Sequence, residues 1–188
     1  MIRRLLLPAL VCAFTGAAPA TFAPAASSHP APGAAGPGMP RFLADGALLR
    51  PDSVERWVLV GTSLGLGYSN ATDDGVGMFH RVYLEPGAYE HFLRTGRFRN
   101  GTMLALSIRH PVRRVPPSRA GWSEGDLVAL ELAVKDPERF RGGWAYFDFG
   151  REGRVARALP GERCARCHAE HAVRDNVFMQ FYPQLRAH

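Results

Sequence analysis

The residues best suited to chemistry form the sequence Cys164-Ala-Arg-Cys167-His168, which has the pattern C-x-x-C-H. Two thiols separated by two residues can each form a thioether bond with a vinyl group of haem, and the next imidazole can coordinate the iron. The pattern therefore predicts one covalently attached haem c, held by Cys164 and Cys167, with His168 as the proximal iron ligand.

Three other interpretations compete with haem attachment: a redox-active cysteine pair, half of a zinc site, and chance. A redox pair is expected in a thioredoxin-like βαβ unit, and a zinc site needs a second pair of ligands. The third cysteine of the chain, Cys12, lies near the N-terminus, far from the motif in sequence. These observations favour haem attachment and indicate a c-type cytochrome.

The position of the motif in the chain indicates whether the protein supplies a sixth ligand on the distal side of the iron. In electron-transferring cytochromes c the motif usually lies near the N-terminus, and a later methionine supplies the sixth ligand. Here only twenty residues follow His168, and Met179, the one methionine among them, would have difficulty reaching the distal side. Upstream candidates are more typical of structural or exposed positions; they are Met78, Met103, His80, His91 and His110. We therefore expect a five-coordinate iron that is open to small ligands.

The first residues have the features of a signal peptide. Arg3 and Arg4 are positive, residues 5–14 are apolar, and Ala18-Pro19-Ala20 offers small residues for cleavage. We expect residues 1–20 to be removed and the protein to be periplasmic. The apolar run is shorter than the roughly 20 residues that a membrane span needs, so no membrane anchor is expected in the mature form.

Composition separates the rest of the chain into two parts. Residues 21–40 are dominated by Ala, Pro, Gly and Ser and predict a disordered linker, followed by one haem domain over residues 41–188. The net charge is +6, and almost all of the positive side chains are arginines, because Lys135 is the only lysine. The arginines are scattered, so nucleic acid is not an expected partner. A solvated surface and an acidic redox partner both fit this charge.

Alternation of residue types predicts strands at residues 57–60, 78–84, 102–109, 126–134 and 144–149. In the third of these, Leu104, Leu106 and Ile108 share one face, and in the fourth Ala129, Glu131 and Ala133 do. A helix is predicted from Glu85-Pro86 to about Arg94, a loop over residues 110–125, and a turn or short helix at Asp136-Pro137. The haem motif lies in a final, largely helical segment. The sum is an α+β fold, mainly antiparallel β, with a sheet of about five strands, flanking helices and a C-terminal helical haem-attachment segment.

Six segments of the folded part allow a comparison with known families: 81–89 (RVYLEPGAY), 95–103 (TGRFRNGTM), 133–136 (AVKD), 143–149 (GWAYFDF), 164–171 (CARCHAEH) and 177–183 (VFMQFYP). Together they resemble the cytochrome P-460 family over roughly residues 45–186, and the C-terminal block is the most specific part. The resemblance implies a mainly antiparallel β fold, commonly a homodimer, with one covalent haem c. The sister group, the cytochromes c′-beta, shares the fold and binds nitric oxide or carbon monoxide in an apolar distal pocket.

One position separates the two branches of this superfamily. In members that oxidise hydroxylamine, a lysine on the strand after the Gly-Thr turn forms a further cross-link to the haem. On the strand opened by Gly101-Thr102, the matching residue of this chain is Leu106, within one or two positions. Lys135 belongs to another segment and is expected to be a solvated residue at a strand end. We therefore expect the cross-link to be absent, since covalent attachment needs a nucleophile held at one place on the ring.

Without a cross-link, Leu106 would contribute to an apolar distal wall that favours neutral diatomic ligands. Phe79 is a candidate aromatic cap over the iron, although ordinary sheet core is an equally good interpretation of both residues. Glu131 is the polar candidate: it is a proton relay or, as we favour, a carboxylate paired with an arginine. After the motif, Phe178, Phe181 and Tyr182 are expected to pack around the imidazole.

These observations lead to three hypotheses of function. The first is an exported mono-haem cytochrome that resembles cytochrome c′-beta and binds nitric oxide or a similar small ligand. The second is an oxidoreductase that converts hydroxylamine or related nitrogen species and passes electrons to a partner cytochrome. The third is a simple electron carrier with a sixth ligand that the sequence does not identify.

Overall fold

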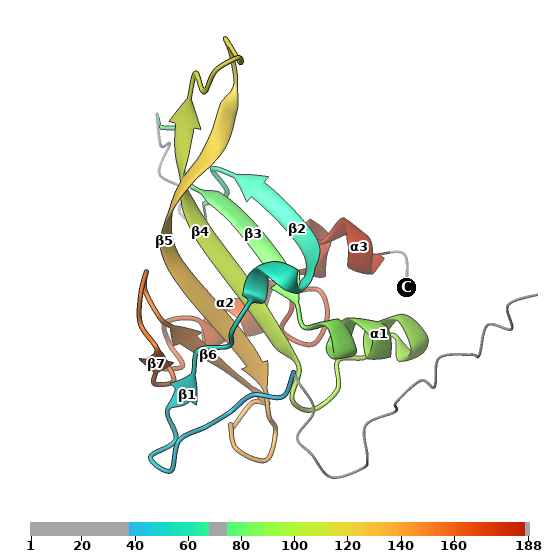
Figure 1. Cartoon of the computed structure of the whole chain (residues 1–188). Helices are drawn as coiled ribbons and strands as arrows, with labels where there is room; N and C mark the ends of the chain where they lie inside the picture. Colours follow the sequence, from blue (N-terminus) through green and yellow to red (C-terminus); the bar gives the residue numbers. More distant parts are fainter. Residues whose placement is uncertain (1–37, 68–74, 187–188) are drawn as a thin grey trace, which may run out of the picture. The chain divides into compact units, whose positions relative to one another are not determined.

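Five antiparallel strands form the main sheet, in the order β2-β3-β4-β5-β6 (Figure 1). Their bounds are β2 Val58–Leu64, β3 Phe79–Leu84, β4 Met103–Arg113, β5 Trp122–Lys135 and β6 Trp144–Asp148. The computed structural model describes residues 38–67 and 75–186. The expected signal peptide (residues 1–20) and almost all of the expected linker (residues 21–40) lie outside the described residues.

The remaining elements are short: β1 Leu48–Leu49, η1 Val54–Arg56, α1 Pro86–Thr95, β7 Val155–Ala156, α2 Ala165–His171, η2 Met179–Phe181 and α3 Pro183–Arg186. β1 pairs with β7 in a second, two-stranded sheet, which alternation could not predict from so few residues. The predicted α+β fold, mainly antiparallel with five strands and flanking helices, is confirmed. Within the described ranges, no helix is long and apolar enough to cross a membrane.

The register between β4 and β5 decides which residues share a face. Leu104 lies opposite Ala133 and Leu106 lies opposite Glu131, so these four side chains are on one face of the sheet. Met103 and the β4 residues at every second position from it therefore point to the other face. The predicted alternation of both strands is confirmed.

Each face of the sheet is covered by a different part of the chain. The segment containing β1 and η1 crosses one face, whereas the segment containing α2 lies on the other (Figure 1). The first core contains Leu48, Val54, Met103, Leu132 and Phe147, and the second contains Val60, Leu104, Trp144, Tyr146 and Val177. The C-terminal segment with the C-x-x-C-H motif is therefore part of a hydrophobic core.

α1 begins where the sequence predicts it and ends one residue later. The carboxylate of Glu85 accepts hydrogen bonds from the backbone N of Gly87 (2.9 Å) and of Ala88 (2.7 Å), and Pro86 occupies the first turn. Gly96 ends the helix with φ of 65°, a conformation that glycine adopts at little cost. The buried side chains of Ala88 and Phe92 attach α1 to the same core as the haem motif.

The prediction of a loop over residues 110–125 was wrong. β4 continues to Arg113 and β5 begins at Trp122, so only the tip of a long hairpin is irregular. The register shifts between Arg109 and Pro111, and a proline is tolerated at such a bulge because the ladder is already interrupted there. The hairpin extends beyond the other strands (Figure 1), and the guanidinium of Arg113 lies 4.7 Å from the ring centre of Trp122.

The C-terminal segment contains less helix than expected. α2 has seven residues and is followed by an irregular stretch before the three-residue η2. Helices this short are held by packing rather than by their own propensity. The segment returns to β2 at Gly61, where a Cβ atom would lie 2.6 Å from Cδ1 of Tyr182. A glycine in β2 thus permits the close approach of the chain that follows the motif.

Candidate functional site

The motif residues occupy the start of α2. Cys164 is the N-cap of the helix, and Cys167 and His168 lie one turn later, so all three belong to neighbouring positions on the helix surface. Both thiols are half-buried and form no disulfide. Burial raises the pKa of the Cys164 thiol, and the nearby carboxylate of Glu131 raises it further. The site thus holds two thiols that no disulfide consumes.

The imidazole of His168 is fixed by its own chain. Its Nδ1 lies 2.8 Å from the carbonyl oxygen of Asn176. A carbonyl only accepts hydrogen bonds, so Nδ1 carries the proton and Nε2 is the free nitrogen. The ring centre lies 4.4 Å from that of Tyr146 and 4.5 Å from that of Phe178. Burial lowers the pKa of His168, and the hydrogen bond with Asn176 opposes this effect. A neutral, oriented imidazole is the form that binds a metal.

A cavity of about 90 Å³ lies between this imidazole and the sheet. Most of its wall is apolar and comes from β3, β4, β5 and β6, together with the residues after α2. Among its lining residues are Val82, Leu104, Leu106, Ala133, Tyr146 and Leu159. The structure therefore brings the predicted Leu106 to the same cavity as His168.

Glu131 is the one carboxylate in the cavity wall. In the part of the chain that the structure describes, it forms neither a hydrogen bond nor an ion pair, contrary to the arginine pair that the sequence favoured. Burial raises its pKa, and the facing carboxylate of Asp148 raises it further, whereas Arg163 has a weaker opposing effect. Glu131 is thus a carboxyl group beside the cavity whose environment favours its protonated form more than water does.

Other predicted residues lie elsewhere. Phe79 does not line the cavity: Val82 faces Leu106, and Phe79, three residues earlier on β3, points to the opposite face. Lys135 is not simply a solvated residue, because its side chain is only 20% exposed and contacts Asp175. Of the aromatic residues expected around the imidazole, Phe178 and Tyr182 line the cavity, whereas Phe181 is partly exposed and packs beside Phe178.

Sequence reasoning missed two members of the site. Tyr146 packs against His168, and its buried hydroxyl has no hydrogen-bond partner among the described residues. Burial and neighbouring thiols raise its pKa, so it stays neutral. Asn176 contributes a backbone carbonyl, which no residue type could have indicated. Tyr146 could have been found, because the strand pattern places it beside Ala133, on the same face of the sheet as Glu131.

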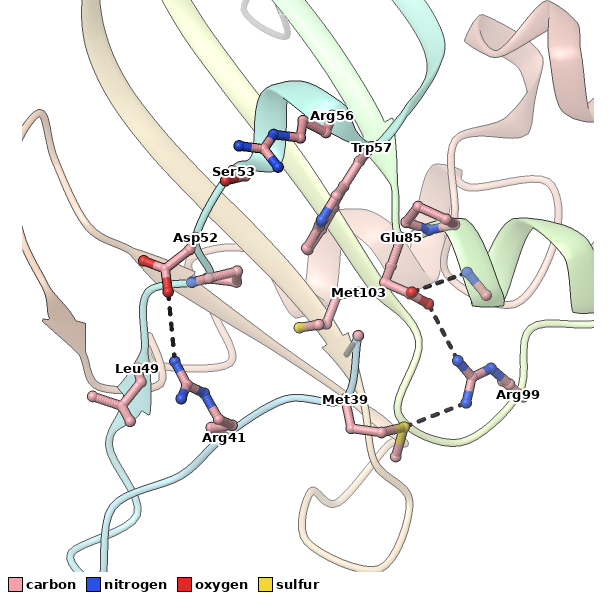
Figure 2. Close-up of a pocket in the computed structure, with 14 residues that line it drawn as sticks. Met39, Arg41, Leu49, Asp52, Ser53, Arg56, Trp57, Glu85, Arg99 and Met103 are labelled. Carbon is pink, nitrogen blue, oxygen red and sulfur yellow. Dashed lines mark hydrogen bonds and ion pairs between the residues drawn. The ribbon is translucent and has the colours of Figure 1, made fainter. Parts of the chain in front are cut away.

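A larger cavity, of about 860 Å³, lies on the other side of the sheet (Figure 2). It is bounded by Trp57 and Met103 and by two ion pairs, Arg99 with Glu85 at 3.2 Å and Arg41 with Asp52 at 3.9 Å. Met103 points away from the face that carries Leu104 and Leu106. The size of this cavity does not make it the active site, because none of the motif residues reaches it.

The donor set beside the smaller cavity fits a haem c. Two free thiols lie on the same short helix as an imidazole whose Nε2 is available, and the cavity that this imidazole lines has a mostly apolar wall. The fit rests on these donors and not on volume, since the cavity is smaller than typical cofactor pockets. Over residues 38–67 and 75–186, no group of three or more His, Cys, Asp or Glu side chains is placed to hold a metal ion directly.

Comparison with protein-family models gives a match over most of the chain. The model of the family described as cytochrome P460 matches residues 51–179 of the chain. The match covers most of the sequence and includes β2 to α2, with the C-x-x-C-H motif, Leu106 and Glu131. No curated protein matches the chain.

Proposed function

Because the chain belongs to the cytochrome P460 family, which implies a haem cofactor, we propose that it is a mono-haem c-type cytochrome that binds small neutral diatomics such as nitric oxide. The observation that carries this proposal is the juxtaposition of the oriented His168 imidazole with the apolar wall around Leu106. In this proposal Cys164 and Cys167 form the two thioethers, and His168 is the proximal ligand.

The residues of the chain have separate tasks in this proposal. The carbonyl of Asn176 holds the tautomer of His168 that presents Nε2. Tyr146 and Phe178 pack on the imidazole and exclude water from it. The haem, when bound, supplies an iron that takes up diatomic ligands and changes oxidation state. An apolar wall stabilises neutral ligands in preference to charged ones.

The side chains in the cavity support the absence of a lysine cross-link. Leu106 lines the cavity, and no lysine does. The only lysine of the chain, Lys135, has its ammonium 2.5 Å from a carboxylate oxygen of Asp175 and 2.9 Å from the carbonyl oxygen of Phe98. A lysine held by these partners is a poor candidate for attachment to the ring.

A second function is favoured by Glu131. An oxidoreductase that acts on hydroxylamine must remove protons from its substrate, and a carboxylate beside the cavity is a suitable acceptor. Glu131 has no ion-pair partner in the described chain, and its raised pKa moves its titration towards neutral pH. This alternative requires Glu131 to take up the proton, with electrons passing to a partner cytochrome.

Further parts of the proposal rest on the sequence. We propose export to the periplasm from the signal-like pattern of residues 1–20. A homodimer and a redox partner cytochrome are proposed from the resemblance to the family. From the short apolar run and the scattered arginines, we propose that the mature form has no membrane anchor and that nucleic acid is not a partner.

Absorption spectra of the ferrous protein, with and without nitric oxide, test these proposals. We expect a five-coordinate spectrum that changes when nitric oxide is added. A strongly red-shifted Soret band would indicate a cross-linked haem and favour the oxidoreductase. A six-coordinate low-spin spectrum that does not respond to nitric oxide would favour the electron carrier. The double variant C164S/C167S is the control, because it should carry no haem on a denaturing gel.

A further inference from the structure

We propose that Lys135 is a positioning residue for the proximal histidine, acting through Asp175 on the turn that contains Asn176. The inference rests on the proposed ligation of the haem iron by His168. It gives a role within the site to the only lysine of the chain, which lies at the end of β5 rather than in the cavity wall.

The first link joins Lys135 to Asp175. The Lys135 ammonium lies 2.5 Å from Oδ2 of Asp175, and its side chain is mostly buried. The other carboxylate oxygen, Oδ1, accepts a hydrogen bond from the indole N–H of Trp144 at 3.2 Å. Both oxygens of Asp175 are therefore held by residues at neighbouring ends of β5 and β6, where Lys135 faces Trp144.

The second link is the backbone of the turn. Asp175 has φ of 48° and Asn176 has φ of 58°, so two successive non-glycine residues adopt the left-handed conformation. Asp and Asn tolerate this region better than most residues, but it is still less stable than the right-handed one. Side-chain contacts at Asp175 compensate by holding the turn in place.

The third link reaches the ligand. The carbonyl of Asn176, one residue after Asp175, accepts the hydrogen bond from Nδ1 of His168 at 2.8 Å. A hydrogen bond from the outer nitrogen of a metal-binding histidine sets the direction of the ring and increases its basicity. Movement of the turn would weaken this bond, and the imidazole would become a weaker donor to the iron.

Backbone hydrogen bonds fix Lys135 in the fold. The N–H of Lys135 donates to the carbonyl of Thr102 (2.9 Å), and the carbonyl of Lys135 accepts from the N–H of Gly101 (2.8 Å). Its ammonium also donates to the carbonyl oxygen of Phe98, whose ring stacks on that of Phe92 at 4.6 Å. Lys135 is therefore fixed to a packed core and holds the turn against that core. The guanidinium of Arg174 also donates a hydrogen bond to the carbonyl oxygen of Gly96 at 3.3 Å.

Substitution of Lys135 in the haem-loaded protein tests the proposal. Lys135→Met keeps the length of the side chain and removes its charge. We expect the iron–histidine stretching frequency of the ferrous protein to fall and the midpoint potential to rise, because a less basic imidazole stabilises ferric iron less. Lys135→Arg, which can still pair with Asp175, should restore both values towards the wild type, whereas Asp175→Ala should resemble Lys135→Met.

The control is an ion pair away from the turn. Arg157 lies 2.6 Å from Asp45, and both side chains are exposed. Arg157→Met should leave the stretching frequency and the potential unchanged. Wild-type values in Lys135→Met, or equal shifts in both variants, would overturn the proposal.

Hydrogen exchange separates this proposal from the proposed function. The N–H of Val177 donates to the carbonyl of Arg174 at 2.8 Å and reports on the turn. Its exchange should be faster in Lys135→Met than in Arg157→Met, and equal rates would overturn the positioning role. A wild-type protein without an iron–histidine band would instead contradict the ligation by His168, while faster exchange would still support the link from Lys135 to the turn.

Discussion

Leu106 and Glu131 lie directly opposite each other on β4 and β5, and both line the cavity beside His168. An apolar side chain and a carboxyl group thus share one cross-strand pair at the wall of the site. The pair separates the two functions considered above, because Leu106 favours neutral ligands and Glu131 is suited to proton uptake.

Leu106→Lys should place an amine in the cavity wall. If Leu106 faces the haem in the loaded protein, we expect an additional covalent bond to the ring, a red-shifted Soret band and a haem-bound peptide around residue 106 by mass spectrometry. Lys135→Leu in the same background removes the other lysine, so any new attachment must come from position 106. An unmodified lysine peptide would show that this position does not reach the ring.

Glu131→Gln should stabilise the protein at neutral pH. The folded-state pKa of Glu131 is raised above its ordinary value of 4.5, so the stability associated with its protonated form is lost as the pH rises through the folded-state pKa. The variant should therefore be more stable than the wild type near neutral pH, with little difference in acid.

Urea unfolding between about pH 4 and about pH 8 measures this effect. Glu152→Gln, at an exposed position, is the control and should change little. A difference between Glu131→Gln and wild type that does not depend on pH would contradict the raised pKa.

Tyr146→Phe should not destabilise the protein. The hydroxyl of Tyr146 is buried without a partner in the described chain, so its removal is expected to leave the free energy of unfolding unchanged or raise it by up to about 1 kcal/mol. Tyr83→Phe offers a matched comparison, since the Tyr83 hydroxyl accepts a hydrogen bond from Arg81 at 3.4 Å. A clear loss of stability in Tyr146→Phe would reveal an interaction of the hydroxyl.

Phe92→Ala should strongly destabilise the fold. Phe92 is fully buried and connects α1 to the core that carries the haem motif, so its truncation is expected to cost about 3 to 5 kcal/mol. Phe181→Ala, at a partly exposed ring, should cost less than about 1 kcal/mol by the same measurement. Similar losses in both variants would contradict the assignment of Phe92 to the core.

Local patterns were sufficient for much of the fold and for the choice of the candidate haem donors. The C-x-x-C-H motif marks candidate donors by residue type and spacing, and α1 is marked by Glu85, Pro86 and Gly96. Strict alternation places Leu106 and Glu131 on one face, since the strand period is two. For the same reason Phe79, an odd number of residues from Val82, could have been assigned to the other face.

Features that depend on distant residues could not be predicted in the same way. Lys135 looks like a surface lysine in sequence because its partner Asp175 lies forty residues later. The carbonyl of Asn176 is a backbone group and carries no signal in the residue type. The extension of β4 and β5 into residues 110–125 was missed because Pro and Arg are frequent in loops, while here they occupy a bulge and an exposed strand end.

The order of the elements along the chain also has a consequence for biogenesis. All five strands of the main sheet precede α2 in sequence, and four of them, β3 to β6, contribute side chains to the cavity wall. During synthesis from the N-terminus, this wall can form before the two thiols become available. The maturing protein would then meet its cofactor with a folded sheet as template, and the C-terminal segment would be the last part to dock.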